Sequence, residues 1–255
     1  RGTTPALPAT GVLISGALRE ADLGQWLDTF ARFRTSAGDF DSALSFPLRI
    51  ENLPIAELRL FGEWVQGAVL DAGLVDQRWQ FRISHPRIQG SATLPEGQRK
   101  LALEFERLLL PLSEKRRRKP SGPGLAAVDP AGLPPASVRV KQLAVGETDL
   151  GSWSFSLEPI PGGAAASNLR IDVSGATFAG VDVNTGAQLR WTAKGNAHRS
   201  EVQGMLRAGN LEDLFAHWGY STGVVSRSAQ VGVDMMWGGE IDLFGARAYP
   251  VVRQA

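Results

Sequence analysis

Apolar and polar residues alternate along most of this chain. The segment 79–84 reads WQFRIS and the segment 152–157 reads SWSFSL, so every second residue is apolar in both. Successive side chains of a β-strand point to opposite faces, and each segment is therefore expected to be a strand with one apolar and one polar face. The same period recurs in 48–51, 100–106, 169–174, 188–192 and 230–235. The alternation predicts a mainly β protein with about a dozen strands, arranged as an antiparallel sheet with hairpins at turn signals.

Two segments break this period, and both follow the same short phrase. The phrase is GALREADLGQW at 16–26 and GMLRAGNLEDL at 204–214, an offset of 188 positions (204 − 16 = 188). From each phrase onward, apolar residues recur every three to four positions, which predicts short amphipathic helices over 22–33 and 210–219. Asp22 and Asn210 are the expected N-caps, since their side chains can accept a hydrogen bond from a free backbone N–H of the first turn.

A second, weaker echo relates LRIENLPI at 48–55 to VRVKQLAV at 138–145, an offset of 90 positions (138 − 48 = 90). Unequal offsets exclude a simple tandem duplication and fit an array of units. We therefore expect 1–36 to end one unit with its helix, 37–112 to form one sheet portion, and 137–239 to form a later unit. The segment 113–136 is rich in Pro and Gly and is expected to be a flexible loop, and 240–255 a tail or edge strand.

The apolar residues of the strands are expected to share one face of the sheet. Two short helices cannot cover a face of this breadth. Either the sheet closes on itself as a sandwich or barrel, or it curves into a trough that stays partly open and binds something apolar. The residues expected on this face are Trp79, Phe81, Ile83, Leu101, Leu103, Phe105, Trp153, Phe155, Leu157, Leu169, Ile171, Val173, Leu189, Trp191, Val231, Val233 and Met235.

Composition and motifs narrow the classes of function. A net charge of +1 over 255 residues creates no field that would attract nucleic acid, and the absence of cysteine excludes disulfides and thiolate chemistry. The three histidines lack metal-binding spacing, and no nucleophile elbow or nucleotide-binding motif is present. Glu104 and Glu106 are spaced as an acid–base pair, but their position opposite the apolar residues favours a solvated face. We therefore expect no enzyme, no metal and no cofactor.

Two further features bear on location. The basic run KRRRK at 115–119 is suited to phospholipid headgroups or a partner, although its Pro- and Gly-rich surroundings favour a solvated loop. No run of about 18 apolar residues is present to span a membrane. The chain begins at Arg1 without a visible signal peptide, and we interpret it as a piece of a longer protein whose anchor lies elsewhere.

Four segments, in this order, resemble the C-terminal AsmA-like region of the bacterial YhdP family: VRVKQLAVGETDLGSWSFSLEP (138–159), LRIDVSGATFAG (169–180), GMLRAGNLEDLFAHWGY (204–220) and VGVDMMWGG (231–239). The stretches 16–30 and 46–52 resemble the part just upstream. The resemblance implies an envelope protein anchored in the inner membrane and crossing the periplasm. It also implies a repeating β-groove whose apolar interior conducts phospholipid towards the outer membrane, with the apolar residues named above lining the groove against acyl chains.

The resemblance carries over no catalytic residue. Its signature positions here are interpreted as structural: Gly16, Leu18, Arg19, Asp22, Leu23, Gly204, Leu206, Arg207, Asn210 and Leu211. Two alternatives to lipid transport remain. One is an envelope scaffold whose apolar face is fully self-packed. The other is a carbohydrate-binding or hydrolytic β-module, which the sequence disfavours because the aromatic residues share a face with Leu, Ile and Val rather than with carboxylates.

Overall fold

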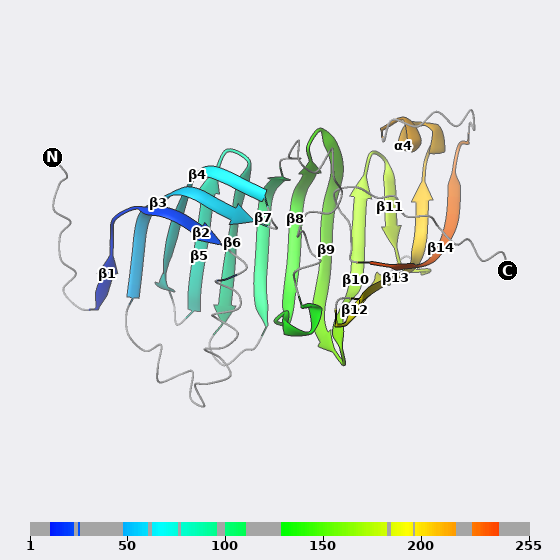
Figure 1. The fold of residues 1–255 in the computed structure, drawn as a ribbon. Helices are drawn as coiled ribbons and strands as arrows, with labels where there is room; N and C mark the ends of the chain where they lie inside the picture. The colour runs from blue at the N-terminus through cyan, green and yellow to red at the C-terminus, as the bar shows by residue number, and fades with distance from the viewer. Residues whose placement is uncertain are drawn as a thin grey trace.

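Figure 1 shows the computed structural model, in which one long, curved sheet carries most of the chain. The structure describes residues 11–22, 25, 48–60, 63–75, 78–95, 100–110, 129–182, 185–195, 197–217 and 226–239. Within these residues lie a sheet of 14 strands, one α-helix and one short 3-10 helix. The prediction of a mainly β fold built on an extended, curved sheet is confirmed.

The strands are β1 (Val12–Ile14), β2 (Leu18–Asp22), β3 (Leu48–Leu60), β4 (Glu63–Val75), β5 (Arg78–His85), β6 (Ile88–Pro95), β7 (Leu101–Leu110), β8 (Ala136–Val145), β9 (Thr148–Ile160), β10 (Gly163–Val173), β11 (Ala176–Ala179), β12 (Ala187–Lys194), β13 (Ala197–Ala208) and β14 (Ala229–Gly238). They follow the order β1-β3-β4-β5-β6-β7-β8-β9-β10-β11-β13-β12, with β2 beside β3 and β14 beside β13. β10 also pairs with β12, so β11 and β12 share the space between β10 and β13.

Most neighbouring strands are antiparallel, but β1–β3, β2–β3 and β7–β8 are parallel. In the last of these pairs Leu101 lies opposite Ala136 and Leu110 lies opposite Val145. The chain therefore leaves β7 at one end of the strands and enters β8 at the other. The prediction of an antiparallel sheet is wrong at these three pairings, because alternation fixes the two faces of a strand but not its direction relative to a neighbour.

The described end of the basic segment packs against the sheet. The Asp129 carboxylate accepts a hydrogen bond from the Ala131 backbone N–H at 3.0 Å and so caps the 3-10 helix η2 (Pro130–Gly132). Pro130 is buried, and η2 lies next to β9, β10 and β12. Ala136, expected as the last residue of the loop, is the first residue of β8. The basic run 115–119 lies outside the described residues.

The weaker echo in the sequence corresponds to a shared bulge in β3 and β8. The β3–β4 pairing is interrupted between Ile50 and Leu53, and the β8–β9 pairing between Val140 and Leu143. Two exposed residues stand between the apolar ones in each strand. A bulge shifts the alternation by one residue, so the apolar residues on both sides of it point to the same face while the strand bends.

The α-helix α4 (Leu211–His217) begins where the repeated phrase predicted. The Asn210 side chain accepts a hydrogen bond from the Glu212 backbone N–H at 3.0 Å, which confirms Asn210 as the N-cap. The corresponding contact at the other phrase joins the Gln25 N–H to the Asp22 carboxylate at 3.3 Å. The rest of the helix predicted for 22–33, the last two residues of that predicted for 210–219, and the tail 240–255 lie outside the described residues.

Candidate functional site

Strand register places the residues predicted for the apolar face side by side on one face of the sheet. Leu157 of β9, for example, lies opposite Ala136 of β8 and Ala166 of β10. Trp153 of the same strand lies opposite Val140 and Ile171. Following such partners from strand to strand gives three apolar rows that cross the sheet at right angles to its strands.

The first row contains Trp79, Leu94, Leu101, Ala136, Leu157, Ala166, Leu189, Val202 and Met235. The second row contains Phe81, Ala92, Leu103, Val138, Phe155, Leu169, Ala187, Gly204 and Val233. The third row contains Ile83, Gly90, Phe105, Val140, Trp153, Ile171, Phe178, Leu206 and Val231. None of these residues carries a charge.

The two remaining predicted residues, Trp191 and Val173, lie on the same face but flank these rows. Trp191 stands beyond the first row, between Ala164 and Ser200 of the neighbouring strands. Val173 stands beyond the third row and lies opposite Ala176. The structure therefore brings all of the predicted residues onto one continuous face.

Burial varies systematically across the rows. The flanking positions are closed: Ser200 and Ile88 are 0% exposed and Trp191 is 4% exposed. In the second and third rows most large side chains are half-buried and Val231 at the β14 edge is exposed, but Leu169 and Val140 are buried. The second and third rows together form what we call the apolar band, a mainly half-buried strip. Its flanks are buried at most strands, whereas Leu157, Leu189 and Met235 of the first row are half-buried. The half-buried large side chains of the band are Phe81, Ile83, Leu103, Phe105, Val138, Trp153, Phe155, Ile171, Phe178, Leu206 and Val233.

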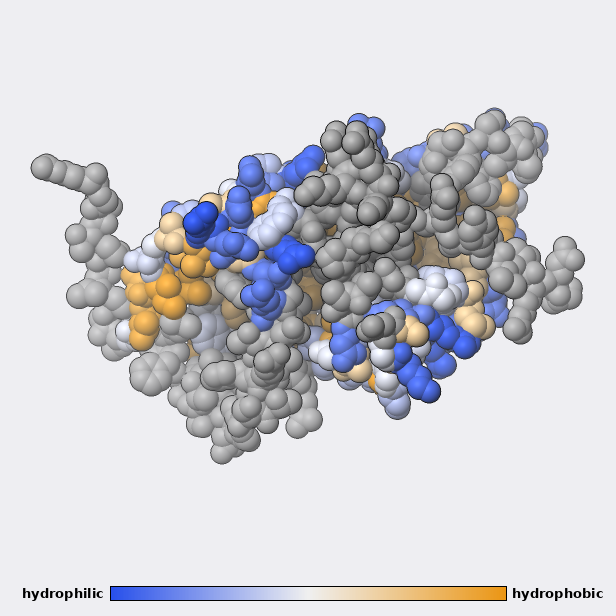
Figure 2. Space-filling model, viewed as in Figure 1, coloured by the Kyte–Doolittle hydropathy of each residue, from blue (hydrophilic) through white to orange (hydrophobic). Residues whose placement is uncertain are grey.

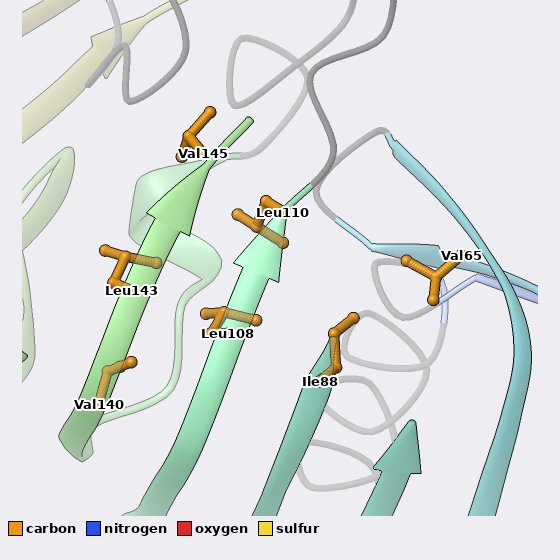
Figure 3. Close-up of a cluster of buried hydrophobic side chains, with 7 residues drawn as sticks. All are labelled: Val65, Ile88, Leu108, Leu110, Val140, Leu143 and Val145. Atoms are coloured by element: carbon orange, nitrogen blue, oxygen red, sulfur yellow. The ribbon is translucent and has the colours of Figure 1, made fainter. Parts of the chain in front are cut away.

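A bent hairpin buries the flank beside the third row in the β3–β7 portion. Figure 1 shows the ends of β3 and β4 passing over the top of the following strands. Val65 of β4 thereby joins a buried cluster with Ile88 and Leu108, and with residues of β8. Figure 3 shows the members of this cluster, with those of β6, β7 and β8 side by side on neighbouring strands and Val65 on the bent hairpin: Val65, Ile88, Leu108, Leu110, Val140, Leu143 and Val145. The bend coincides with Gly67, whose φ of 78° strains residues with a side chain.

The helix α4 buries the equivalent flank in the β8–β14 portion. Leu214 is completely buried and packs with Val173, Ala176 and Ala208 at the ends of β10, β11 and β13. His217, at the end of the helix, contacts the backbone oxygen of Asp149 at 3.1 Å. A helix and a hairpin thus cover corresponding positions along the band.

The sheet also exposes apolar side chains at its β1 edge. Figure 2 shows apolar residues gathered at this end of the molecule. Val12 is 46% exposed and Ile14 is 41% exposed. The apolar surface therefore reaches both outer strands, β1 and β14.

The polar atoms of the tryptophans at the band are satisfied by nearby protein groups. The Trp153 indole N–H donates to the Leu150 carbonyl at 2.8 Å. The Trp191 indole N–H donates to Nδ1 of His198 at 3.1 Å. Because these bonds tie down the one polar atom of each ring, the remaining ring surface is free to act as an apolar contact.

The face of the sheet opposite the apolar band is polar and carries several ion pairs. Glu104 pairs with Arg139 at 3.6 Å and Glu106 pairs with Lys141 at 2.8 Å, across the parallel β7–β8 junction. Both carboxylates are exposed, which agrees with the solvated-face interpretation of these residues. For Asp172, burial raises the pKa of the carboxyl, but hydrogen bonds from Arg170 and Thr177 outweigh it and the pKa lies below its ordinary value.

His85 connects the β5–β6 turn to the bend of β4. Its Nδ1 accepts a hydrogen bond from the Arg87 backbone N–H at 3.1 Å. Burial lowers the pKa of His85, a backbone hydrogen bond with Gln66 raises it, and the Arg87 charge lowers it; the net direction is downward. Among the described residues, no group of three or more His, Cys, Asp or Glu side chains is arranged to hold a metal ion.

The repeated phrase has a local structural purpose in its second copy. Gly204 lies on the apolar face, and a Cβ there would stand 2.6 Å from the Phe178 ring and 2.7 Å from Ala187. Arg207 faces the other way and donates hydrogen bonds to the carbonyls of Gly180 and Val181. These bonds fix the chain where it crosses from β11 to β12. In the first copy Gly16 has open space around it, but its φ of 141° favours glycine.

Sequence reasoning missed the residues that bury the flanks. Val65, Ile88 and Leu108 were not among the predicted face residues. The alternation that would have revealed β6 is present in 88–94, but Gly90 and Ala92 occupy two of its apolar positions and weaken the signal. In β4 the bend at Gly67 breaks the period, so that Val65 and Ala68, three positions apart, are both buried.

No helix in the described part of the chain is long and apolar enough to cross a membrane. No curated protein matches the sequence, and no solved structure matches it. The family model described as YhdP protein matches residues 1–247, almost the whole chain. The order of the sequence phrases, the large curved sheet and this match agree, and the chain belongs to the YhdP family of AsmA-like bacterial envelope proteins.

Proposed function

We propose that the apolar band conducts phospholipid acyl chains between the inner and outer membranes. In this proposal the chain is part of a longer periplasmic protein anchored in the inner membrane, and membrane contacts are made by parts outside it. The band acts as a surface along which lipid moves, without covalent chemistry, metal or cofactor. Membership of the YhdP family, a family of envelope lipid-transport proteins rather than of enzymes, supports this assignment.

The observation that carries the proposal is the burial profile across the strands. A sheet with a fully self-packed face would bury its central rows most deeply, because the centre of a packed layer lies farthest from solvent. Here flanking residues such as Ile88 and Trp191 are buried, whereas most large side chains of the central rows remain partly exposed, Phe81, Phe155 and Val233 among them. Leu169 and Val140 are the buried exceptions in the central rows. A strip of partly accessible apolar side chains bordered largely by buried ones suits a long, narrow apolar ligand.

The energetics favour a track that is continuous rather than selective. Removing one CH₂ group from water is worth about 0.8 kcal/mol, so a chain of about sixteen carbons gains on the order of 12 kcal/mol from an apolar environment. A lipid leaving a bilayer for water would lose this free energy. The three rows keep apolar residues on every strand from β5 to β14, so each step along the band exchanges one apolar contact for another.

Lipid extraction followed by mass spectrometry tests the proposal. The chain, purified from a bacterial envelope fraction, is expected to carry phospholipid, and a diazirine-acyl phosphatidylethanolamine is expected to label β5, β7 and β9. A protein without bound lipid and without labelling would instead support the structural scaffold. Labelling confined to the polar face would also contradict transport along the band.

A further inference from the structure

Two positions of the apolar band lack a side chain and are covered by a phenylalanine ring from a neighbouring strand. A Cβ built on Gly90 would stand 2.4 Å from Cδ1 and 3.0 Å from Cε1 of Phe105. A Cβ built on Gly204 would stand 2.6 Å from Cζ of Phe178. Real Cβ atoms do not approach other atoms so closely, so each ring occupies part of the volume that a side chain would need. The backbone oxygens of Glu104, at 2.8 Å from the Gly90 Cβ position, and of Ala179, at 2.7 Å from that of Gly204, restrict the rest. One pair lies in the β3–β7 portion and the other in the β8–β14 portion.

Both glycines stand where a side chain is expected to project into the band. Gly90 belongs to the third row and lies opposite Ile83, and Gly204 belongs to the second row and lies opposite Val233. Glycine in the interior of a strand weakens it and marks a close approach of another group. Neither Gly90 nor Gly204 has a positive φ, so backbone conformation does not explain the choice of glycine at either position.

At Gly90 and Gly204 the phenylalanine ring of one strand also covers the backbone of the neighbouring strand. Elsewhere in the band each strand supplies its own side chain, for example Leu103, Val138 and Phe155 on successive strands. At Gly90 and Gly204 the neighbouring ring therefore stands in for the missing side chain of the band. Phe105 and Phe178 are both half-buried, so part of each residue is accessible although its ring lies close to the glycine.

We propose that Gly90–Phe105 and Gly204–Phe178 are two acyl-chain seats, in which the ring sets how deeply a chain lies in the band. This inference rests on the proposed function and names the residues that determine fit within it. An acyl chain rests on the accessible side of the ring, or replaces the ring over the glycine when the ring rotates aside. Replacing the ring by an acyl chain exchanges one apolar contact for another and therefore costs little free energy. Partly exposed side chains change rotamer within nanoseconds, so the ring can move aside rapidly.

A purely structural role makes a different prediction. An aromatic ring packed over a strand glycine also stabilises a sheet by covering exposed backbone. In that case removing the ring lowers stability and removes lipid contact area, as at any other aromatic residue of the band. If the ring sets depth, removing it opens a hollow over the glycine that an acyl chain fills, so that lipid contact at that place increases.

Photolabelling of Phe105→Ala and Phe178→Ala separates these roles. Each variant of the chain is incubated with vesicles containing phosphatidylethanolamine that carries a diazirine in one acyl chain, and adducts are mapped by peptide mass spectrometry. Phe105→Ala is expected to raise labelling of β6 and β7 severalfold, while β11 and β13 stay as in the wild type. Phe178→Ala is expected to do the reverse. The matched control is Phe81→Ala, which removes a half-buried ring that stacks on Trp79 and is expected to lower labelling locally.

The inference is overturned if Phe105→Ala and Phe178→Ala lower local labelling as Phe81→Ala does while the wild type is labelled along the band. That result leaves the proposed function standing. Absence of labelling in the wild type overturns the proposed function itself. If an alanine variant does not fold, Phe105→Leu and Phe178→Leu keep an apolar side chain but leave part of the glycine uncovered, and the same increase in local labelling is required of them.

Discussion

The β3–β7 and β8–β14 portions of the sheet close the same flank of the apolar band with different elements. In the first portion the ends of β3 and β4 bend over the sheet and bring Val65 into the cluster around Ile88. In the second, the separate helix α4 places Leu214 against Val173. The two portions therefore share a buried flank, but the element that buries it differs. A unit of this fold therefore tolerates replacement of a strand pair by a helix, provided that one large apolar side chain is seated at the flank.

The largest expected effect follows from placing a charge in either flank. Val65→Asp and Leu214→Asp each bury an unpaired carboxylate and are expected to lower the free energy of unfolding by several kcal/mol. Chemical denaturation measures the loss, and hydrogen exchange locates it. Val65→Asp should first expose amides of β6 and β7, and Leu214→Asp those of β10 and β13. Equal loss of protection over the whole sheet for both variants would contradict two separately closed flanks.

A charge in the band itself is expected to act on lipid rather than on folding. Phe155 is half-buried, so the carboxylate of Phe155→Asp keeps water contact and the free energy of unfolding should fall by only about 1–2 kcal/mol. Circular dichroism and photolabelling on the same variant should then show a folded protein with reduced labelling. Ser154→Asp, one position along on the polar face, is the control and should leave labelling unchanged. An unfolded Phe155→Asp would favour the self-packed scaffold.

The capping residues in the two copies of the repeated phrase, Asp22 and Asn210, make different side-chain contacts. Asn210→Ala removes the bond to the Glu212 N–H and is expected to cost about 1 kcal/mol. Asp22→Ala removes the bond to the Gln25 N–H and also an ion pair with Arg59 at 3.4 Å, so its cost should be larger, up to about 2 kcal/mol. Thermal unfolding of both variants compares them. A smaller loss at Asp22 than at Asn210 would contradict the double role.

The smallest expected effect is a pH dependence confined to the first portion. The pKa of His85 is lowered in the folded protein, chiefly by burial, so the unfolded chain binds the proton more tightly. The contribution of His85 to stability is therefore complete above the ordinary histidine pKa of about 6.5 and declines as the pH falls below it. Denaturation of wild type and His85→Gln between neutral and mildly acidic pH should show a shallower decline in the variant. Identical pH profiles would remove His85 as the cause.

The faces of the strands were predictable from sequence, because a period of two assigns each side chain to one side whatever the pairing partner. That is why all of the predicted residues, from Trp79 to Met235, lie on one face. The α4 start was predictable for a similar local reason, since Asn210 and the Leu211–Leu214 spacing are encoded within one turn.

Strand direction and the closed flanks were not predictable, because they depend on contacts between residues far apart in the chain. Nothing in 101–110 or 136–145 marks the pairing of β7 with β8 as parallel. The backbone at Asn52 in β3 and at Gly67 in β4 interrupts the alternation of apolar and polar residues. A period of two therefore does not predict that Leu58 and Val65 are buried. The Gly90–Phe105 contact joins neighbouring strands, and in the sequence Gly90 reads only as a weak strand position.

The parallel junctions have a consequence for how such a molecule grows. β3 to β7 are five strands that reverse direction in turn, so β7 runs the same way as β3, and the parallel pairing makes β8 run that way too. A five-strand module entered in this manner passes the same polarity on to the next, and adding one lengthens the protein by about 24 Å, at about 4.8 Å per strand. The β8–β14 portion does not have this property, because β14 runs opposite to β8. The length of an envelope protein built this way is then set by the number of copies of the module. Gene duplication can adjust it in fixed increments without inverting any surface, whereas loss of a single strand would reverse everything downstream.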